Sequence, residues 1–93
     1  MLENLWDEKE KLRDAYRENR SDEVCQVLFG KAINAWETAL ENTLKENNVS
    51  WKKPHSFFDL DSGLELEGDK LITKLSAVLG SSLVEKMSFD FRF

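Results

Sequence analysis

The sequence of 93 residues contains little cysteine, proline and glycine, and these shortages argue against an internal disulfide and an interdomain linker. A single cysteine excludes an internal disulfide and suits a reducing compartment, so we expect a cytoplasmic protein. No apolar run approaches the roughly 18 residues that a membrane helix needs. The first residues, MLENLWDEKEK, carry acids where a secretory signal has a basic stretch. One proline and four scattered glycines form no linker, so we expect a single domain over residues 1–93.

Positive charge is also in short supply. Thirteen Lys and Arg residues stand against 18 Asp and Glu, which gives a formal net charge of −5. A phosphate backbone is bound mainly through cations, so we expect no direct contact with nucleic acid. Hydrophobic residues make up 41% of the chain and aromatic residues 11%, which favours a folded domain over a disordered chain.

Helical periodicity governs residues 1–46, which we expect to form a helical hairpin. Apolar residues at spacings of three, four and seven predict a first helix over residues 2–20; they are Leu2, Leu5, Leu12, Trp6 and Tyr16. Ser21 or Asp22 is placed to cap a second helix that continues to Glu46. The second helix is apolar on two sides, with a stripe of large side chains beside a stripe of alanines.

Short alternating segments replace the helical pattern near residue 48. Residues 47–55 read as a loop, and residues 57–69 alternate between apolar and acidic side chains, which predicts a β-hairpin. A three-residue turn at residues 61–63 pairs Leu60 with Leu64 and Phe58 with Leu66, and so keeps the leucines on the buried face. It also places Gly63 where a positive φ is needed.

A third helix and a last strand complete the predicted fold. Asp69 is placed to cap the helix and Gly80 to end it, with an inner face made of Leu71, Ile72, Leu75, Val78 and Leu79. Alternation over residues 83–93 predicts a C-terminal strand. The expected class is α+β: two N-terminal helices, then a hairpin, helix and strand over residues 56–93. These strands form a small, mostly antiparallel sheet with helices on one face.

Catalytic and metal-binding chemistry has little support. His55 and Cys25 lie in different elements, so they form no nucleophile–base pair, and we interpret them as a loop residue and a small packing residue. Asp59 and Glu65 are expected opposite each other on the solvent face of the hairpin, without a cleft. Residues 59–63 resemble the start of an EF-hand loop, but Lys70 stands where the twelfth-position glutamate belongs. We therefore expect no enzyme, no metal site and no cofactor, and keep a calcium-responsive module as a third hypothesis.

The acidic segment, residues 59–69, holds five carboxylates and no base. Like charges across a strand pair destabilise it by a few tenths to about 1 kcal/mol, and a cationic partner would relieve that cost. Solubility and protection of the strand edge explain the segment equally well. If the segment binds a partner, the predicted electrostatic contacts are Asp59, Asp61, Glu65 and Glu67, and the predicted apolar anchors are Phe57 and Trp51.

The expected function is that of a small acidic, non-enzymatic binding module that neutralises or inhibits a basic protein, such as a toxin or a nucleic-acid-processing enzyme. Bacterial immunity proteins, antitoxins and phage-encoded inhibitors are classes that this chain resembles in general size and charge. The alternative is an oligomeric structural subunit. It would self-associate as a homodimer through the second helix or the C-terminal strand.

Overall fold

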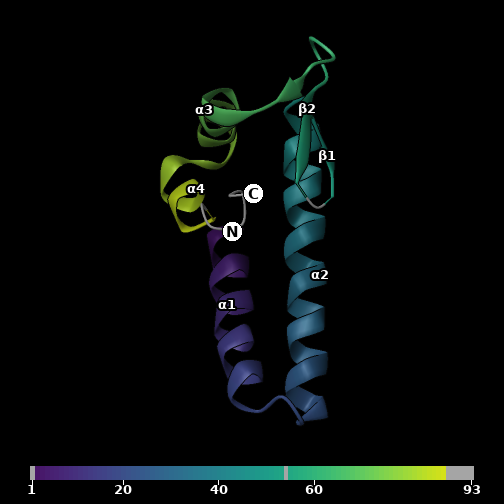
Figure 1. Cartoon of the computed structure of the whole chain (residues 1–93), viewed down its shortest axis with the longest axis vertical. Helices are drawn as coiled ribbons and strands as arrows, with labels where there is room; N and C mark the ends of the chain where they lie inside the picture. The colour runs from purple at the N-terminus through teal and green to yellow at the C-terminus, as the bar shows by residue number, and fades with distance from the viewer. Residues whose placement is uncertain (1, 54, 88–93) are drawn as a thin grey trace. The chain divides into compact units, whose positions relative to one another are not determined.

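The computed structural model describes residues 2–53 and 55–87 (Figure 1). The chain divides into two compact units, Met1–Leu40 and Glu41–Phe93. The α+β class expected from the sequence is confirmed, since four helices and a three-stranded antiparallel sheet occupy the described residues.

The first unit is a helical hairpin, as predicted. Helix α1 spans Leu2–Glu18, and helix α2 spans Glu23–Glu46 and so continues into the second unit. Asp22 caps α2, because its Oδ1 accepts a hydrogen bond from the Val24 N–H at 2.9 Å. The cap satisfies one of the amides that a helix leaves unpaired at its start, which fixes where the chain turns back.

Aromatic pairs hold the two helices of this unit together. The Trp6 and Trp36 rings meet edge to face with centroids 5.2 Å apart, and the Tyr16 and Phe29 rings lie 5.8 Å apart. Residues near the start of α1 therefore contact the middle of α2, and residues near its end contact the beginning of α2. This pairing makes the helices antiparallel, as Figure 1 shows.

The second unit contains the sheet, and one of its strands contradicts the sequence prediction. Strand β1, Val49–Lys52, lies within the segment expected to be a loop over residues 47–55. It pairs antiparallel with β2, Ser56–Asp59, which pairs in turn with β3, Glu65–Leu66. Asn48 reverses the chain directly after α2 by taking a positive φ of 60°. A period-two pattern does not stand out over only four residues, so the sequence does not predict β1.

The register between β2 and β3 is shifted by one residue from the prediction. Phe57 pairs with Leu66 and Phe58 with Glu65, so the expected Leu60–Leu64 and Phe58–Leu66 pairs are wrong. A one-residue shift exchanges the two faces of a strand, and Phe57 is accordingly the fully buried residue of β2. The reason lies in β1: the Trp51 ring stacks on the Phe57 ring at 5.9 Å, and this partner belongs to a strand that the sequence did not reveal.

Helices α3 (Gly68–Leu79) and α4 (Ser81–Met87) complete the described chain. Asp69 is not the N-cap of α3; Glu67 holds that position without a side-chain hydrogen bond, and Asp69 lies in the first turn. Gly80 ends α3 as predicted, with φ at 89° and its N–H donating to the Ser76 carbonyl. Ile72 is exposed instead of lying on the inner face.

The predicted C-terminal strand is wrong over residues 83–87, which belong to α4. Leu83, Val84 and Met87 are buried, and their spacing of one and four residues fits one face of a helix but not one face of a strand. Residues 88–93, with the phenylalanines that suggested the strand, lie outside the described residues. The third strand of the sheet is therefore β1.

Candidate functional site

The turn between β2 and β3 is built by a local network of hydrogen bonds. The Asp59 N–H donates to the Leu64 carbonyl at 2.9 Å, and the Gly63 N–H donates to the Asp59 carbonyl at 2.7 Å. Gly63 has a φ of 73°, and the positive sign agrees with the prediction from the sequence. The Leu60 N–H donates to the Asn48 carbonyl at 2.9 Å, which joins the turn to the residue before β1. The turn is thus fixed at both its base and its side.

Asp59 organises this turn with its own carboxylate. Its Oδ1 accepts a hydrogen bond from the Asp61 N–H at 3.0 Å, and its Oδ2 accepts one from the Ser62 hydroxyl at 3.2 Å. Hydrogen bonds that an aspartate side chain accepts from the residues just after it are typical of tight turns. Asp59, predicted as a partner contact, therefore has a structural role in holding the turn.

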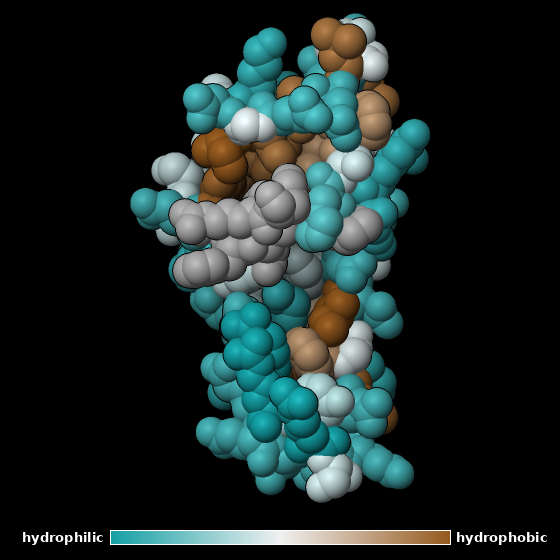
Figure 2. Space-filling model, in the orientation of Figure 1, coloured by the Kyte–Doolittle hydropathy of each residue, from teal (hydrophilic) through white to brown (hydrophobic). Residues whose placement is uncertain are grey.

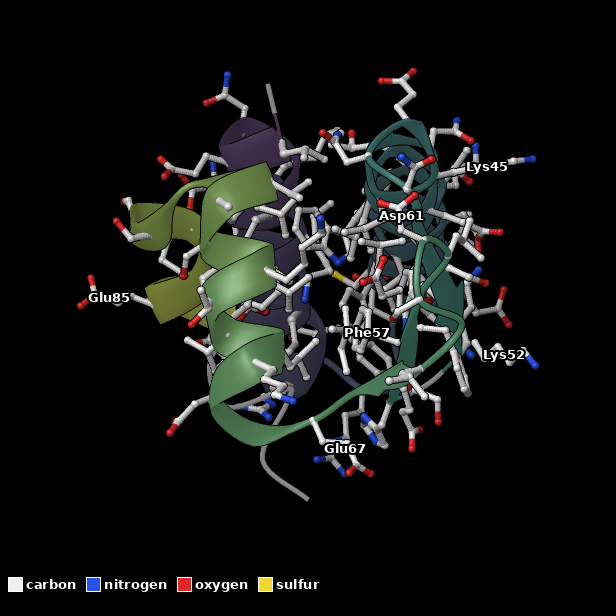
Figure 3. The ribbon with its side chains drawn as sticks, turned by 90° about the horizontal axis from the view of Figure 1, so that it is seen from above. Lys45, Lys52, Phe57, Asp61, Glu67 and Glu85 are labelled. Carbon is white, nitrogen blue, oxygen red and sulfur yellow. The ribbon has the colours of Figure 1, made fainter. Side chains whose placement is uncertain are left out.

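The shifted register separates the carboxylates across the strands. Glu65 lies opposite Phe58, whereas Asp59 bonds to Leu64, so the expected Asp59–Glu65 pair is wrong. The two acids therefore do not repel each other across the strands as predicted, and this repulsion gives no reason to expect a cationic partner. The Asp61 and Glu67 side chains lie apart in Figure 3, so the negative charge is spread along the acidic segment and not concentrated at one point.

Two leucines are exposed on the same segment. Leu60 is 55% exposed and Leu64 68% exposed, although the sequence pattern places both on the buried face. Figure 2 shows hydrophobic surface at the top of the molecule, over the β2–β3 turn, beside hydrophilic surface. The alternation of apolar and acidic residues indicates that Leu60 and Leu64 share a face, but the prediction that this face is buried is wrong. Leu60 and Leu64 are the candidate contact residues that sequence reasoning missed.

The predicted apolar anchors are placed differently. Phe57 is fully buried beneath Trp51, so it supports the sheet and presents no surface to a partner. Figure 3 shows Phe57 directed inward, whereas Lys52 and Glu67 point away from the molecule. Trp51 is half-buried, with one face on Phe57. Phe57 therefore offers no surface to a partner as an apolar anchor, and Trp51 is only partly exposed.

Two lysines at the end of β1, Lys52 and Lys53, contact groups outside the carboxylates of the acidic segment. Lys52 Nζ lies 4.9 Å from the centre of the Phe58 ring. Lys53 Nζ pairs with Glu41 Oε2 at 3.3 Å and lies 5.4 Å from the centre of the Trp51 ring. In residues 2–53 and 55–87, no ion pair involves a carboxylate of the acidic segment. Among the described residues the carboxylates of the segment are therefore not ion-paired, although Lys70 and Lys74 line the same hollow as Asp69.

Two hollows border the acidic segment within the second unit. One, of about 210 Å³, is lined by Glu41, Lys45, Val49, Ser50, Trp51 and Leu60. The other, of about 420 Å³, is lined by Leu66, Asp69, Lys70, Thr73, Lys74 and Ala77. Leu60 therefore lies at the edge of a concavity.

The other chemistry-bearing residues do not assemble into a site. Cys25 is a free, half-buried thiol in the first unit, and partial burial together with the nearby Asp22 carboxylate raises its pKa. His55 is exposed beside β2. Over the described ranges, no three His, Cys, Asp or Glu side chains gather as a metal site requires. No described helix has the length and apolar character needed to cross a membrane.

Comparison with known proteins gives no match: no family model, no curated protein and no solved structure is similar to this chain.

Proposed function

We propose that this chain is a small, non-enzymatic binding module that inhibits a basic partner protein through its acidic segment. The observation that carries the proposal is the exposure of Leu60 and Leu64 on a segment whose charged residues are all carboxylates. Single exposed leucines are ordinary on protein surfaces, but two on one hydrogen-bonded turn, among carboxylates that form no ion pair in the described part of the chain, are typical of a recognition surface.

The partner has the complementary chemistry: an apolar recess with a cationic rim. Proteins that act on nucleic acids carry cationic surfaces because phosphates must be neutralised. An acidic module of this kind occupies such a surface and keeps the nucleic acid away from it. This mode is that of immunity proteins, antitoxins and phage-encoded inhibitors, and it places both proteins in the cytoplasm.

Charge and apolar contact contribute differently to this complex. Asp61, Glu65 and Glu67 steer the encounter, so they mainly raise the association rate and make it sensitive to salt. Full burial of a leucine contributes about 1.5–3 kcal/mol, so covering the exposed parts of Leu60 and Leu64 contributes roughly 2–4 kcal/mol together. This corresponds to about 30- to 1,000-fold in affinity.

The hydrogen-bonded turn lowers the cost of binding. Asp59 holds residues 61 and 62 through both carboxylate oxygens before any partner arrives. Because a loop already fixed in one conformation loses less entropy on association, the turn presents its leucines at little further cost.

The experiment is affinity capture from a lysate of the native host with the immobilised full chain and two charge-reversed variants. One variant carries D61K, E65K and E67K. The control carries E8K, D14K and E18K, three exposed positions of α1, so that both variants have the same net charge. We expect the wild type and the control to retain the same basic protein and the acidic-segment variant to lose it. Retention by all three proteins, or loss by both variants, contradicts the proposal.

A third variant separates contact from charge. L60S with L64S keeps every charge but removes the apolar contacts, so we expect the captured protein to dissociate at least about tenfold faster with little change in the salt dependence of association. Binding that is unaffected by this change shows that the segment acts through net charge alone and refutes the leucine contact.

A second candidate function, self-association, is favoured by a separate observation. Val24, Val27 and Leu28 at the beginning of α2 are exposed aliphatic residues in the first unit. The C-terminal strand that also suggested self-association is α4 over residues 81–87, so α2 is the surface that supports this candidate.

A further inference from the structure

The first turns of α2 carry an apolar patch on the side that faces away from α1. Val24, Val27 and Leu28 are 65%, 54% and 45% exposed, and their spacing of three and four residues places them on one side of the helix. Phe29 and Trp36, whose rings contact α1, lie on the opposite side. We call these three residues the outer patch.

The charges around the outer patch cancel, unlike those of the acidic segment. Residues 17–31 contain three bases, Arg17, Arg20 and Lys31, and three acids, Glu18, Asp22 and Glu23. A second copy of the chain, which repels the first through the acidic segment, meets no net repulsion here. A strongly charged partner of either sign gains no net attraction from this surface.

We infer that the outer patch is an isologous interface in which the α2 helices of two copies pack antiparallel. The inference rests on the second candidate function, self-association, and specifies its geometry. In a twofold arrangement centred on Val27 and Leu28, residue 27 of one copy lies opposite residue 28 of the other. Val27 of each copy then covers Leu28 of the other, so the centre of the outer patch is buried.

The same register brings opposite charges together twice. Val24 lies opposite Lys31 of the second copy, whose aliphatic stem covers the valine while its ammonium group reaches Glu23. Across the described part of the chain, neither Glu23 nor Lys31 takes part in an ion pair. The pattern is self-complementary, and this selects a second copy over an unrelated protein as the occupant.

The size of the outer patch sets the strength of the dimer. Stable complexes bury about 1,200–2,000 Å² in total, and three aliphatic side chains per copy form a core smaller than most of these. We therefore expect a weak, concentration-dependent dimer with a dissociation constant on the order of 10–100 μM.

Sedimentation equilibrium of the full chain measures this association. L28K places a charge in the centre of the interface, and we expect it to weaken dimerisation by at least about tenfold. The control is I72K, which changes an exposed aliphatic residue of α3 in the same way and leaves dimerisation unchanged. Both positions are exposed in the monomer, and circular dichroism checks that each variant remains folded.

A charge exchange tests the register. E23K and K31E each place like charges across the interface and are expected to weaken the dimer, whereas the double variant E23K/K31E restores it. Rescue by the double variant supports the antiparallel arrangement. A dimer that persists in L28K, or that the double variant fails to rescue, overturns this interface while self-association stands. A chain that stays monomeric well above the expected dissociation constant overturns both.

Discussion

Replacement of Phe57 tests which face of β2 is buried. Phe57 is fully buried and stacks on Trp51, whereas Phe58 is half-buried beneath Lys52. Truncation of a buried phenylalanine to alanine costs about 3–5 kcal/mol, and the lost ring stack places Phe57→Ala towards the upper end. Phe58→Ala loses part of an exposed ring and one cation–π contact, so we expect about 1–2 kcal/mol.

These costs are large relative to the stability of a chain of this length. At about 0.05–0.15 kcal/mol per residue, 93 residues give a free energy of unfolding of roughly 5–14 kcal/mol. At the lower end of this range Phe57→Ala leaves almost no net stability, and a large fraction of the protein is then unfolded. Phe57→Leu keeps most of the apolar volume, and we expect a cost of about 1–2 kcal/mol, which leaves the protein measurable.

Urea denaturation followed by far-ultraviolet circular dichroism and by tryptophan fluorescence gives the free energy of unfolding of each variant. The expected order of destabilisation is Phe57→Ala, then Phe58→Ala, with Phe57→Leu no worse than Phe58→Ala. If Phe58→Ala costs as much as Phe57→Ala or more, then Phe58 is the buried residue. In that case the alternation-based pairing of Phe58 with Leu66 is right and the register described above is wrong.

Further predictions concern two glycines and the thiol. Gly30 lies inside α2 with no atom near the place of an added Cβ, so Gly30→Ala is expected to raise the free energy of unfolding by about 0.5–1 kcal/mol. Gly63 has a φ of 73°, so Gly63→Ala is expected to lower the free energy of unfolding by about 1–2 kcal/mol. Thermal denaturation measures both, and a Gly63→Ala variant that is more stable than the wild type contradicts the turn geometry. Partial burial and the Asp22 carboxylate raise the pKa of Cys25, so less of the reactive thiolate is present at neutral pH. Iodoacetamide is therefore expected to alkylate Cys25 more slowly in the folded protein than in the urea-unfolded chain. The alkylation rate of the folded protein is expected to rise with pH. Asp22→Asn keeps a capping oxygen and removes the charge, so it should speed alkylation without reaching the unfolded rate, because burial is the larger cause; a rate equal to that of the wild type refutes the contribution of Asp22.

The sequence predicts the location of the acidic segment from its charge, but it predicts wrongly which apolar side chains of this region are exposed. The run of carboxylates from Asp59 to Asp69 is visible in the sequence, because charge needs no partner to be recognised. The exposure of Leu60 and Leu64 and the burial of Phe57 are not visible there, because alternation marks two faces without saying which one is covered.

The sequence by itself determined the helical hairpin, the end of α3 at Gly80 and the positive φ at Gly63. These features depend on contacts within a few residues: helical spacing, a capping aspartate and the conformational freedom of glycine. The tertiary structure decided the strand β1, the register of β2 and the helical state of residues 81–87. Each of these depends on which distant side chain covers an apolar face. The stack of Trp51 on Phe57 is the case in point, since it joins two strands and buries the face of β2 that the local pattern assigned to solvent.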